Sequence, residues 1–70
     1  MKLLNISSSF INGVGYKPDE KTMHIRFSKG ATYAYYNVPE SVYHELTNTK
    51  SGGAYFNSAV KNRYDYTKIA

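Results

Sequence analysis

The sequence predicts an α+β fold, a three-stranded antiparallel β-meander covered on one face by two short C-terminal helices. Residues 22–28 alternate strictly between apolar and polar side chains, the pattern of a half-buried strand. Residues 31–36 are rich in tyrosine and are soon followed by Pro39, after which apolar residues recur at helical spacing. A sheet with one apolar face needs one covering layer, so both helices are expected on the same side.

The three strands are expected over residues 10–17, 21–28 and 31–37. Two glycines in the first strand are typical of a bulge or of close approach by another backbone. In the middle strand, the alternation places three apolar side chains on one side and polar ones, among them His24 and Arg26, on the other. This strand therefore has one packing face and one candidate contact face.

The helices follow the meander. Residues 40–46 carry apolar side chains at helical spacing, and the Glu40 carboxylate is favourable at the positive end of a helix. A second helix is expected to start with Ser51 as its capping residue, and its apolar stripe runs over residues 55–60. Both helices are predicted to be short.

The ends of the chain carry weaker patterns. Serines interrupt the apolar residues of segment 3–11, which favours an irregular lead-in or a short edge strand. Residues 65–70 show no strong pattern. With no internal repeat or linker in the sequence, residues 1–70 are expected to form a single domain.

The direction of the tyrosines depends on the loop between the second and third strands. In one arrangement, residues 29 and 30 alone form this loop. Tyr33 then lies opposite Arg26, because residue pairs across a hairpin share a face. Tyr35 lies opposite His24 for the same reason. The two rings then stand beside cations on the uncovered face, as in platforms that stack the bases of single-stranded nucleic acid.

In the other arrangement, Ser28 joins the loop and Gly30 adopts the left-handed conformation. Every side chain of the third strand then changes face. Tyr33 and Tyr35 join the core under the helices, and Tyr36 becomes the exposed ring. The need of a short chain for large rings inside favours this arrangement, but the sequence leaves both open.

The charge balance favours an anionic partner. Nine Lys and Arg residues against five Asp and Glu residues give a net charge of +4, which attracts phosphate groups. The expected partner is therefore RNA or a small phosphorylated nucleotide. The small core of a short, tyrosine-rich chain also favours a homodimer or a higher homo-oligomer.

Other function classes have little support in the sequence. The chain has no cysteine, and His24 and His44 lie far apart without a third ligand, so no metal site and no cofactor are expected. No nucleophile, base and acid are spaced for catalysis, so the chain is not expected to be an enzyme. No apolar segment is long enough for a signal peptide or a membrane span, which predicts a cytoplasmic protein without membrane contact.

The start of the second helix is another candidate site. Two glycines leave backbone N–H groups accessible to a phosphate, and Lys50 and the helix dipole add attraction. The alternative is a capped helix start whose glycines allow close packing on the sheet. Cations at the end of this helix serve either binding or the helix dipole. The candidate residues for nucleotide or nucleic-acid binding are His24, Arg26, Tyr33, Tyr35, Tyr36, Lys50, Ser51, Gly52, Gly53, Asn57, Lys61 and Arg63.

The chain resembles the KTSC domain, a small domain found alone in bacteria and phages and at the C-terminus of some lysyl-tRNA synthetases. The resemblance rests on Ser8-Ser9, Ile11 to Tyr16, Gly30, Tyr33-Ala34-Tyr35, Val38-Pro39, Val42-Tyr43, Leu46, Ser51, Gly53, Tyr55-Phe56-Asn57, Val60-Lys61 and Tyr64. Members often have a charged residue where this chain has Ala34, which would mark the tyrosines as inward. The resemblance favours buried tyrosines here, and the association with a synthetase implies a role with RNA.

Three functions remain as hypotheses. The leading one is a non-catalytic nucleic-acid or nucleotide-binding module that uses a basic and aromatic surface. The second is a homo-oligomeric sponge, as in phages, that sequesters a small phosphorylated messenger such as a cyclic nucleotide. The third is a protein–protein adaptor anchored by an exposed tyrosine among Tyr36, Tyr43 and Tyr66.

Overall fold

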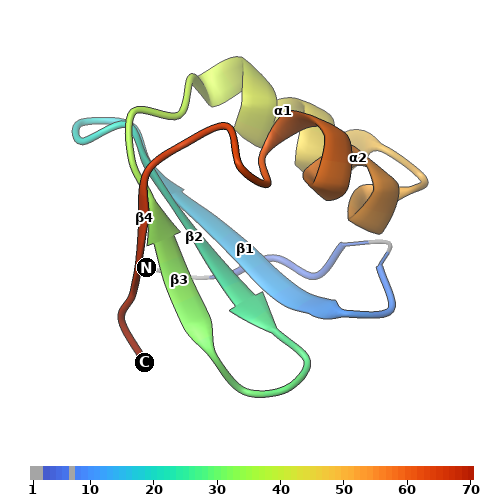
Figure 1. Cartoon of the computed structure of the whole chain (residues 1–70). Helices are drawn as coiled ribbons and strands as arrows, with labels where there is room; N and C mark the ends of the chain where they lie inside the picture. The colour runs from blue at the N-terminus through green and yellow to red at the C-terminus, as the bar shows by residue number, and fades with distance from the viewer. Residues whose placement is uncertain (1–2, 7) are drawn as a thin grey trace.

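The chain folds into a four-stranded antiparallel sheet with both helices on one face (Figure 1). The computed structural model describes residues 3–6 and 8–70. The elements are, in chain order, β1 (Ile11–Lys17), β2 (Thr22–Phe27), β3 (Thr32–Tyr35), α1 (Glu40–Asn48), α2 (Gly52–Ala59) and β4 (Tyr66–Lys68). The strands lie side by side in the same order. The predicted α+β layout is confirmed, and the number of strands needs correction.

The fourth strand corrects the prediction of a three-stranded sheet. β4 pairs antiparallel with β3, so that Tyr66 lies opposite Tyr35 and Lys68 lies opposite Tyr33. All three side chains of β4 are exposed. Because a strand is recognised in a sequence by alternation between buried and exposed positions, this one leaves no such signal. The tail of the chain therefore completes the sheet.

The loop between β2 and β3 contains the three residues 28–30. The N–H of Phe27 donates to the carbonyl oxygen of Ala31 at 2.8 Å, which closes the hairpin around these residues. Gly30 has a φ of 104°, a conformation in which a side chain is unfavourable. The three-residue loop with a left-handed glycine is thus the arrangement that the chain adopts.

This loop sets the direction of the tyrosines. Tyr35 pairs with Met23, and Tyr33 pairs with Ile25. Met23 and Ile25 are completely buried beneath the helices, so both tyrosines lie on the covered face. Tyr35 is buried as predicted and Tyr33 is partly buried, so the alternative of a stacking platform on the uncovered face is wrong.

The core lies between the sheet and the two helices. β1 and β2 contribute aliphatic side chains, while α1 contributes Leu46 and α2 contributes Phe56. The buried core residues are Ile11, Val14, Met23, Ile25, Tyr35, Val38, Leu46, Phe56 and Val60. Both helices are therefore held by a small number of inward side chains.

The edge strand β1 contains the irregularity expected from its glycines. The pairing of β1 with β2 shifts between Ile11 and Gly13, which marks a bulge. A Cβ atom on Gly13 would lie 2.9 Å from the Cβ of Leu3, so the lead-in chain approaches closely. Leu4 forms an isolated antiparallel bridge with Val14. The described residues before β1 thus form an irregular lead-in that touches the sheet edge.

The helices begin largely where the sequence predicts. Pro39 takes the N-cap position of α1, and Glu40 lies in the first turn. Ser51 takes the N-cap position of α2, but its side chain makes no capping hydrogen bond, so the predicted capping role is wrong. The N–H of Ser51 instead donates to Oγ1 of Thr49 at 3.2 Å. In the described part of the chain, neither helix has the length or hydropathy for crossing a membrane.

Candidate functional site

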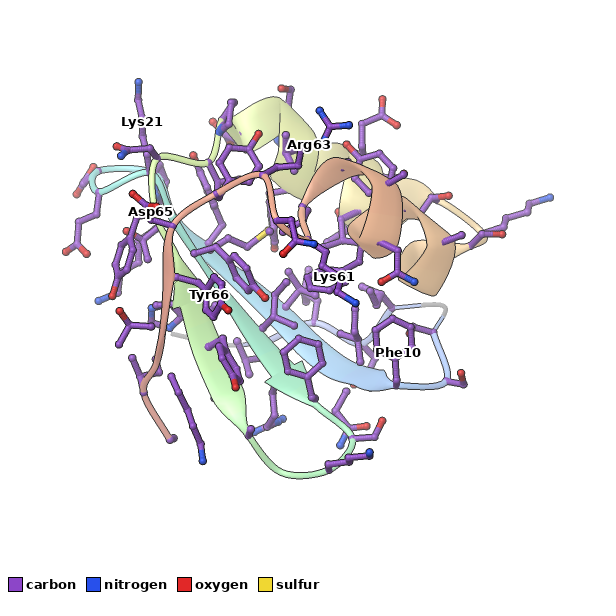
Figure 2. The ribbon with its side chains drawn as sticks, in the orientation of Figure 1. Phe10, Lys21, Lys61, Arg63, Asp65 and Tyr66 are labelled. Carbon is purple, nitrogen blue, oxygen red and sulfur yellow. The ribbon has the colours of Figure 1, made fainter. Side chains whose placement is uncertain are left out.

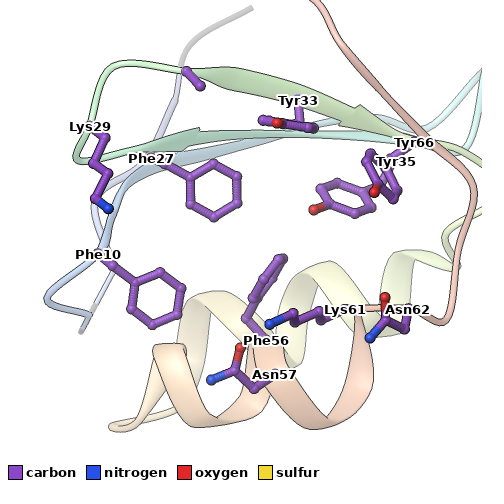
Figure 3. A pocket seen from close by; sticks show the side chains of 11 residues that line it. Phe10, Phe27, Lys29, Tyr33, Tyr35, Phe56, Asn57, Lys61, Asn62 and Tyr66 are labelled. Atoms are coloured by element: carbon purple, nitrogen blue, oxygen red, sulfur yellow. The ribbon is translucent and has the colours of Figure 1, made fainter.

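A cleft of about 490 Å³ opens between the sheet and α2 (Figure 3). Its aromatic lining consists of Phe10, Phe27, Tyr33, Tyr35, Phe56 and Tyr66. Its other lining residues are Lys29, Ala31, Asn57, Lys61 and Asn62. Residues of the sheet and of the β2–β3 loop form one wall, and residues of α2 and the following turn form the other. This space is called the aromatic cleft below.

Contacts among the rings fix the shape of the aromatic cleft. The ring of Tyr35 meets Phe56 edge to face, with centroids 5.8 Å apart and an interplanar angle of 82°. Tyr66 of β4 lies against both Tyr35 and Tyr33, at 5.5 Å and 5.6 Å between centroids. Such edge-to-face and tilted contacts are favourable for aromatic pairs. These contacts join β3, β4 and α2 into one aromatic lining.

The opposite end of the cleft is also aromatic. The rings of Phe10 and Phe27 are nearly parallel, at 4°, with centroids 6.3 Å apart. Phe56 meets both of them edge to face. Phe56 therefore connects the two ends of the cleft into one aromatic surface.

The polar groups of the cleft are cationic or amide groups. Lys29 and Lys61 contribute two ammonium groups, while Asn57 and Asn62 each offer a donor and an acceptor. The lining includes no carboxylate, and neither lysine forms an ion pair with another described residue. The cleft thus combines an apolar, ring-lined interior with positive charge and amide groups.

Tyr35 is the most buried of the tyrosines that line the cleft. Its side chain is 5% exposed. Burial raises the pKa of its phenol to about 12, and the neighbouring Tyr66 and Tyr33 add to the rise in pKa. The phenol consequently stays protonated, and keeps its hydrogen-bond donor, at a pH near 10, where an ordinary tyrosine ionises.

A second hollow of about 400 Å³ lies beside the aromatic cleft. Its lining residues are Tyr36, Asn37, Asn62, Arg63, Tyr64 and Asp65. Asn62 lines both spaces, so the two adjoin at this residue. Figure 2 shows Lys61, Arg63, Asp65 and Tyr66 along this side of the molecule. The second space is called the polar hollow below.

The predicted binding residues divide between these two spaces and other places. Four of them line the aromatic cleft: Tyr33, Tyr35, Asn57 and Lys61. Tyr36 and Arg63 line the polar hollow. The structure thus gathers half of the predicted set on one side of the molecule, although the tyrosine pair lies within the cleft and not on an open platform.

His24 and Arg26 lie on the other face of the sheet. His24 pairs with Ala34 and Arg26 pairs with Thr32, and neither lines the aromatic cleft or the polar hollow. Partial burial lowers the pKa of His24, with the nearby Lys17 adding to the effect. These two residues do not belong to the candidate site.

The start of α2 is also separate from both spaces. Lys50, Ser51, Gly52 and Gly53 line neither of them. A Cβ atom on Gly53 would lie 2.6 Å from a ring carbon of Phe10. This contact favours the alternative in which the glycines allow close packing.

Seven further lining residues of the cleft were not among those predicted to bind a nucleotide. Phe10, Phe27 and Phe56 look like ordinary core residues, since large apolar rings usually pack inside. Lys29 looks like a turn residue, and Tyr66, in the tail, is predicted only as an anchor for a protein partner. The lining residues outside the predicted nucleotide-binding set are Phe10, Phe27, Lys29, Ala31, Phe56, Asn62 and Tyr66.

The site provides no recognisable metal centre. Within residues 3–6 and 8–70, no three His, Asp or Glu side chains come together to hold a metal ion. The chemistry of the two spaces is that of non-covalent binding by rings, amides and isolated charges.

Comparisons with known proteins place this geometry in a family. The family model of the KTSC domain matches residues 7–64. A protein of Tsukamurella paurometabola is 42% identical over 59 residues, which cover 84% of this chain and 88% of that protein. A crystal structure of a KTSC domain protein from Yersinia pestis superposes with a TM-score of 0.91 at 33% identity, covering 99% of this chain and 97% of that chain.

Longer proteins also contain a matching region. A lysine–tRNA ligase of Nostoc sp. strain PCC 7120 is 35% identical over 68 residues, which cover 97% of this chain but only 12% of the ligase. An uncharacterized protein of Stutzerimonas stutzeri is 36% identical over 70 residues and covers 99% of both chains. The similarity thus extends both to proteins of the same size and to a small part of a larger enzyme.

Proposed function

The chain belongs to the KTSC domain family, and from that premise we propose that it is a non-catalytic binding module for a nucleotide. The nucleotide is either free in solution or an unpaired residue of RNA. The observation that carries this proposal is the aromatic cleft, in which six rings meet two lysines and two asparagines.

The size and lining of the cleft support a planar ligand. Its volume of about 490 Å³ lies within the range of about 300–1,000 Å³ for small-molecule sites. Proteins recognise unpaired bases by stacking them on aromatic rings and by hydrogen-bonding their edges. The rings and the amides of Asn57 and Asn62 are groups suited to both tasks.

The charges of the cleft support an anionic group on the same ligand. Lys29 and Lys61 lack ion-pair partners among the described residues, and no carboxylate lines the cleft. Lysine binds phosphate as a compact point charge. A nucleotide satisfies both requirements, because it joins a planar base to a phosphate.

The relatives support the RNA form of the ligand. The lysine–tRNA ligase of Nostoc contains a region similar to nearly the whole chain, as 12% of its length. A domain attached to an enzyme that is named for a tRNA substrate is well placed to contact RNA. The free-nucleotide form corresponds to a sponge that sequesters a small messenger such as a cyclic nucleotide.

Calorimetric titration tests the proposal. The ligands are ribonucleoside 5′-monophosphates, cyclic nucleotides and a short single-stranded RNA, each at two salt concentrations. The variant Lys29→Gln/Lys61→Gln is expected to lose about tenfold or more in affinity, because it removes two charge-assisted contacts. The matched control, Lys17→Gln/Lys50→Gln, removes the same charge outside the cleft and should bind nearly as the wild type does.

The salt dependence separates the two forms of the ligand. The logarithm of the affinity for single-stranded RNA should fall with the logarithm of the salt concentration, with a slope of about 0.7 per phosphate contacted. A tight free nucleotide should stabilise the fold by about 2.7 kcal/mol at 100 times its dissociation constant. Absence of binding to every ligand at low salt, or equal losses in the two double variants, would contradict the proposal.

Exposed tyrosines give a second candidate function, the protein–protein adaptor. Tyr66 is 55% exposed and Tyr36 is 36% exposed, and tyrosine is enriched at binding hot spots. Tyr43 is a weaker anchor, since its ring stacks on Tyr16 at 5.3 Å between centroids. Pull-downs with Tyr36→Ala and Tyr66→Ala should lose a partner under this function, and unchanged recovery would count against it.

Self-association is a further part of the proposal. The small core leaves several large apolar side chains exposed, and pairing would cover them. These side chains are Leu4, Tyr36, Tyr66 and Ile69. Light scattering is expected to show a dimer or a larger assembly, and a particle of only 8.0 kDa would contradict this part.

A further inference from the structure

The polar hollow differs in charge from the aromatic cleft. Arg63 and Asp65 bring one positive and one negative charge to its lining, together with two tyrosines and two asparagines. Among the described residues, neither Arg63 nor Asp65 forms an ion pair. A carboxylate disfavours a phosphate at the same point and accepts hydrogen bonds from hydroxyl groups. The chemistry beside Asp65 therefore matches a neutral group rich in hydroxyls.

We propose that the polar hollow takes the ribose of a nucleotide whose base lies in the aromatic cleft, with the Asp65 carboxylate accepting a hydrogen bond from the 2′-hydroxyl. This inference rests on the proposed function of the cleft. It adds a sugar site and a preference for ribonucleotides, whether the nucleotide is free or part of RNA.

The position of Asn62 supports this division of the ligand. Asn62 lines both spaces, so a ligand that fills both passes this residue. In a nucleotide the sugar is attached directly to the base. A base held among the rings of the cleft therefore presents its sugar at the junction with the polar hollow.

The walls of the polar hollow are held by the backbone. The N–H of Tyr36 donates to the carbonyl oxygen of Asp65 at 2.9 Å, which ties the end of β3 to the approach to β4. Asn37 and Asn62 have φ values of 58° and 63°, a left-handed conformation that asparagine tolerates better than most residues. Asp65 is thus placed by a hydrogen-bonded backbone, and its carboxylate needs no role in the fold.

The cations on either side of Asn62 complete the site. Lys61 lines the aromatic cleft and Arg63 lines the polar hollow. Their Cα atoms are at most about 7.6 Å apart, because two peptide units separate them. A phosphate on the ribose at the junction would have Lys61 on the side of the cleft and Arg63 on the side of the polar hollow, while Asp65 would face the hydroxyl groups.

The test compares ribonucleotides with matched 2′-deoxynucleotides. One arm uses nucleoside 5′-monophosphates such as AMP and dAMP, and the other uses short single-stranded oligoadenylate and its deoxy counterpart. The wild type should bind the ribose form roughly threefold to tenfold more tightly, the range expected of one hydrogen bond. A preference in the first arm identifies a free nucleotide as a ligand, and one in the second arm identifies RNA.

The variant Asp65→Ala should bind the ribose form only as well as the deoxy form, while its affinity for the deoxy form is not reduced. The matched control is Asp19→Asn, which removes the other aspartate, in the β1–β2 turn, and should keep the preference. A melting curve confirms that each variant is folded. Equal affinities of the wild type for ribose and deoxy forms would overturn the inference while leaving the proposed function intact. Absence of binding to both forms would overturn both.

Discussion

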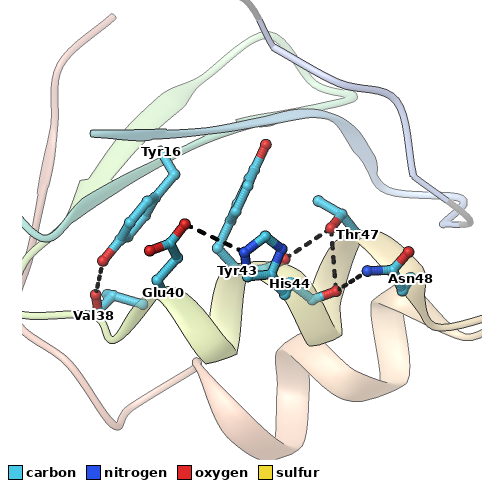
Figure 4. Close-up of polar contacts among 7 residues, drawn as sticks. All are labelled: Tyr16, Val38, Glu40, Tyr43, His44, Thr47 and Asn48. Atoms are coloured by element: carbon cyan, nitrogen blue, oxygen red, sulfur yellow. Dashed lines mark hydrogen bonds and ion pairs between the residues drawn. The ribbon is translucent and has the colours of Figure 1, made fainter. Parts of the chain in front are cut away.

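The phenol of Tyr16 donates a hydrogen bond of 2.6 Å to the carbonyl oxygen of Val38 (Figure 4). This bond ties β1 to the segment that leads into α1. The ring of Tyr16 also stacks on Tyr43 of α1, with an interplanar angle of 16°. One side chain thereby fixes the start of α1 against the sheet.

Replacing Tyr16 with phenylalanine should lower the free energy of unfolding by about 1–3 kcal/mol. Val38 is completely buried, so its carbonyl oxygen would lose this partner without gaining water. Urea denaturation measures the effect. The matched control is Tyr43→Phe, which keeps the stacked pair and should change stability by less than about 0.5 kcal/mol. Equal midpoints for wild type and Tyr16→Phe would contradict the prediction.

Replacing Gly53 with alanine should destabilise the fold by about 1–3 kcal/mol, the range for overpacking. The new Cβ would lie 2.6 Å from a Phe10 ring carbon and 3.3 Å from Oγ of Ser8. That hydroxyl is already engaged, because it accepts hydrogen bonds from the N–H groups of Phe10 and Ile11. Thermal denaturation gives the size of the loss.

A double variant isolates the cause of this loss. In the background of Phe10→Ala, the ring is absent, and Gly53→Ala should be neutral or stabilising because alanine is the better helix former. If Gly53→Ala is equally destabilising in both backgrounds, contact with the Phe10 ring is not the reason.

His24 should make stability fall as the pH falls. Its folded pKa lies below the ordinary value of 6.5, chiefly because of burial. The unfolded chain therefore takes up a proton at a higher pH than the folded chain, so stability is present above pH 6.5 and is lost as the pH drops through the folded pKa. Melting temperatures between pH 8 and pH 5.5 should fall less in His24→Gln than in the wild type.

The second histidine provides the control for this pH dependence. The side chain of His44 is 61% exposed and lies 3.3 Å from a carboxylate oxygen of Glu40 (Figure 4). His44→Gln should keep the loss of stability that His24 causes. If the pH dependence disappears in His44→Gln and persists in His24→Gln, the assignment of the effect to His24 is wrong.

Tyr35 should make stability fall at alkaline pH. Its folded pKa is raised from 10.0 to about 12, so the unfolded chain loses the phenolic proton first. The stability is fully present below pH 10 and is lost as the pH rises towards 12. Guanidinium unfolding at pH 9 and pH 11 should show a smaller loss in Tyr35→Phe than in the wild type, whereas Tyr36→Phe should lose as much as the wild type does.

Much of the fold could be predicted because local pattern and tertiary packing agree. The alternation around Met23 and Ile25 identifies β2, and helical spacing identifies the region of both helices. It was harder to predict on which face of the sheet Tyr33 and Tyr35 lie, because this depends on a single residue of the β2–β3 loop. The conformation of Gly30 settles them, and only the folded chain reveals that conformation.

The remaining features depend on contacts between distant segments. β4 forms by pairing with the neighbouring strand β3, where Tyr66 lies opposite Tyr35. No pattern within the tail of the sequence indicates that pairing. The lining of the aromatic cleft is likewise assembled from Phe10, Phe56 and Tyr66, which lie far apart in the chain. Sequence reasoning selected Lys61 and Asn57 by residue type, but it could not show that they share a cleft with these rings.

The position of β4 has a consequence for the order in which the molecule assembles and opens. The first three strands are joined by short turns, whereas both helices intervene before β4 pairs with β3. Closing long loops slows the formation of contacts, and weakly buried segments open most easily. β4 should therefore dock last and exchange its amide hydrogens first. Tyr66 forms part of the wall of the aromatic cleft. A ligand that binds against this ring would therefore slow the exchange of the amide hydrogens of β4.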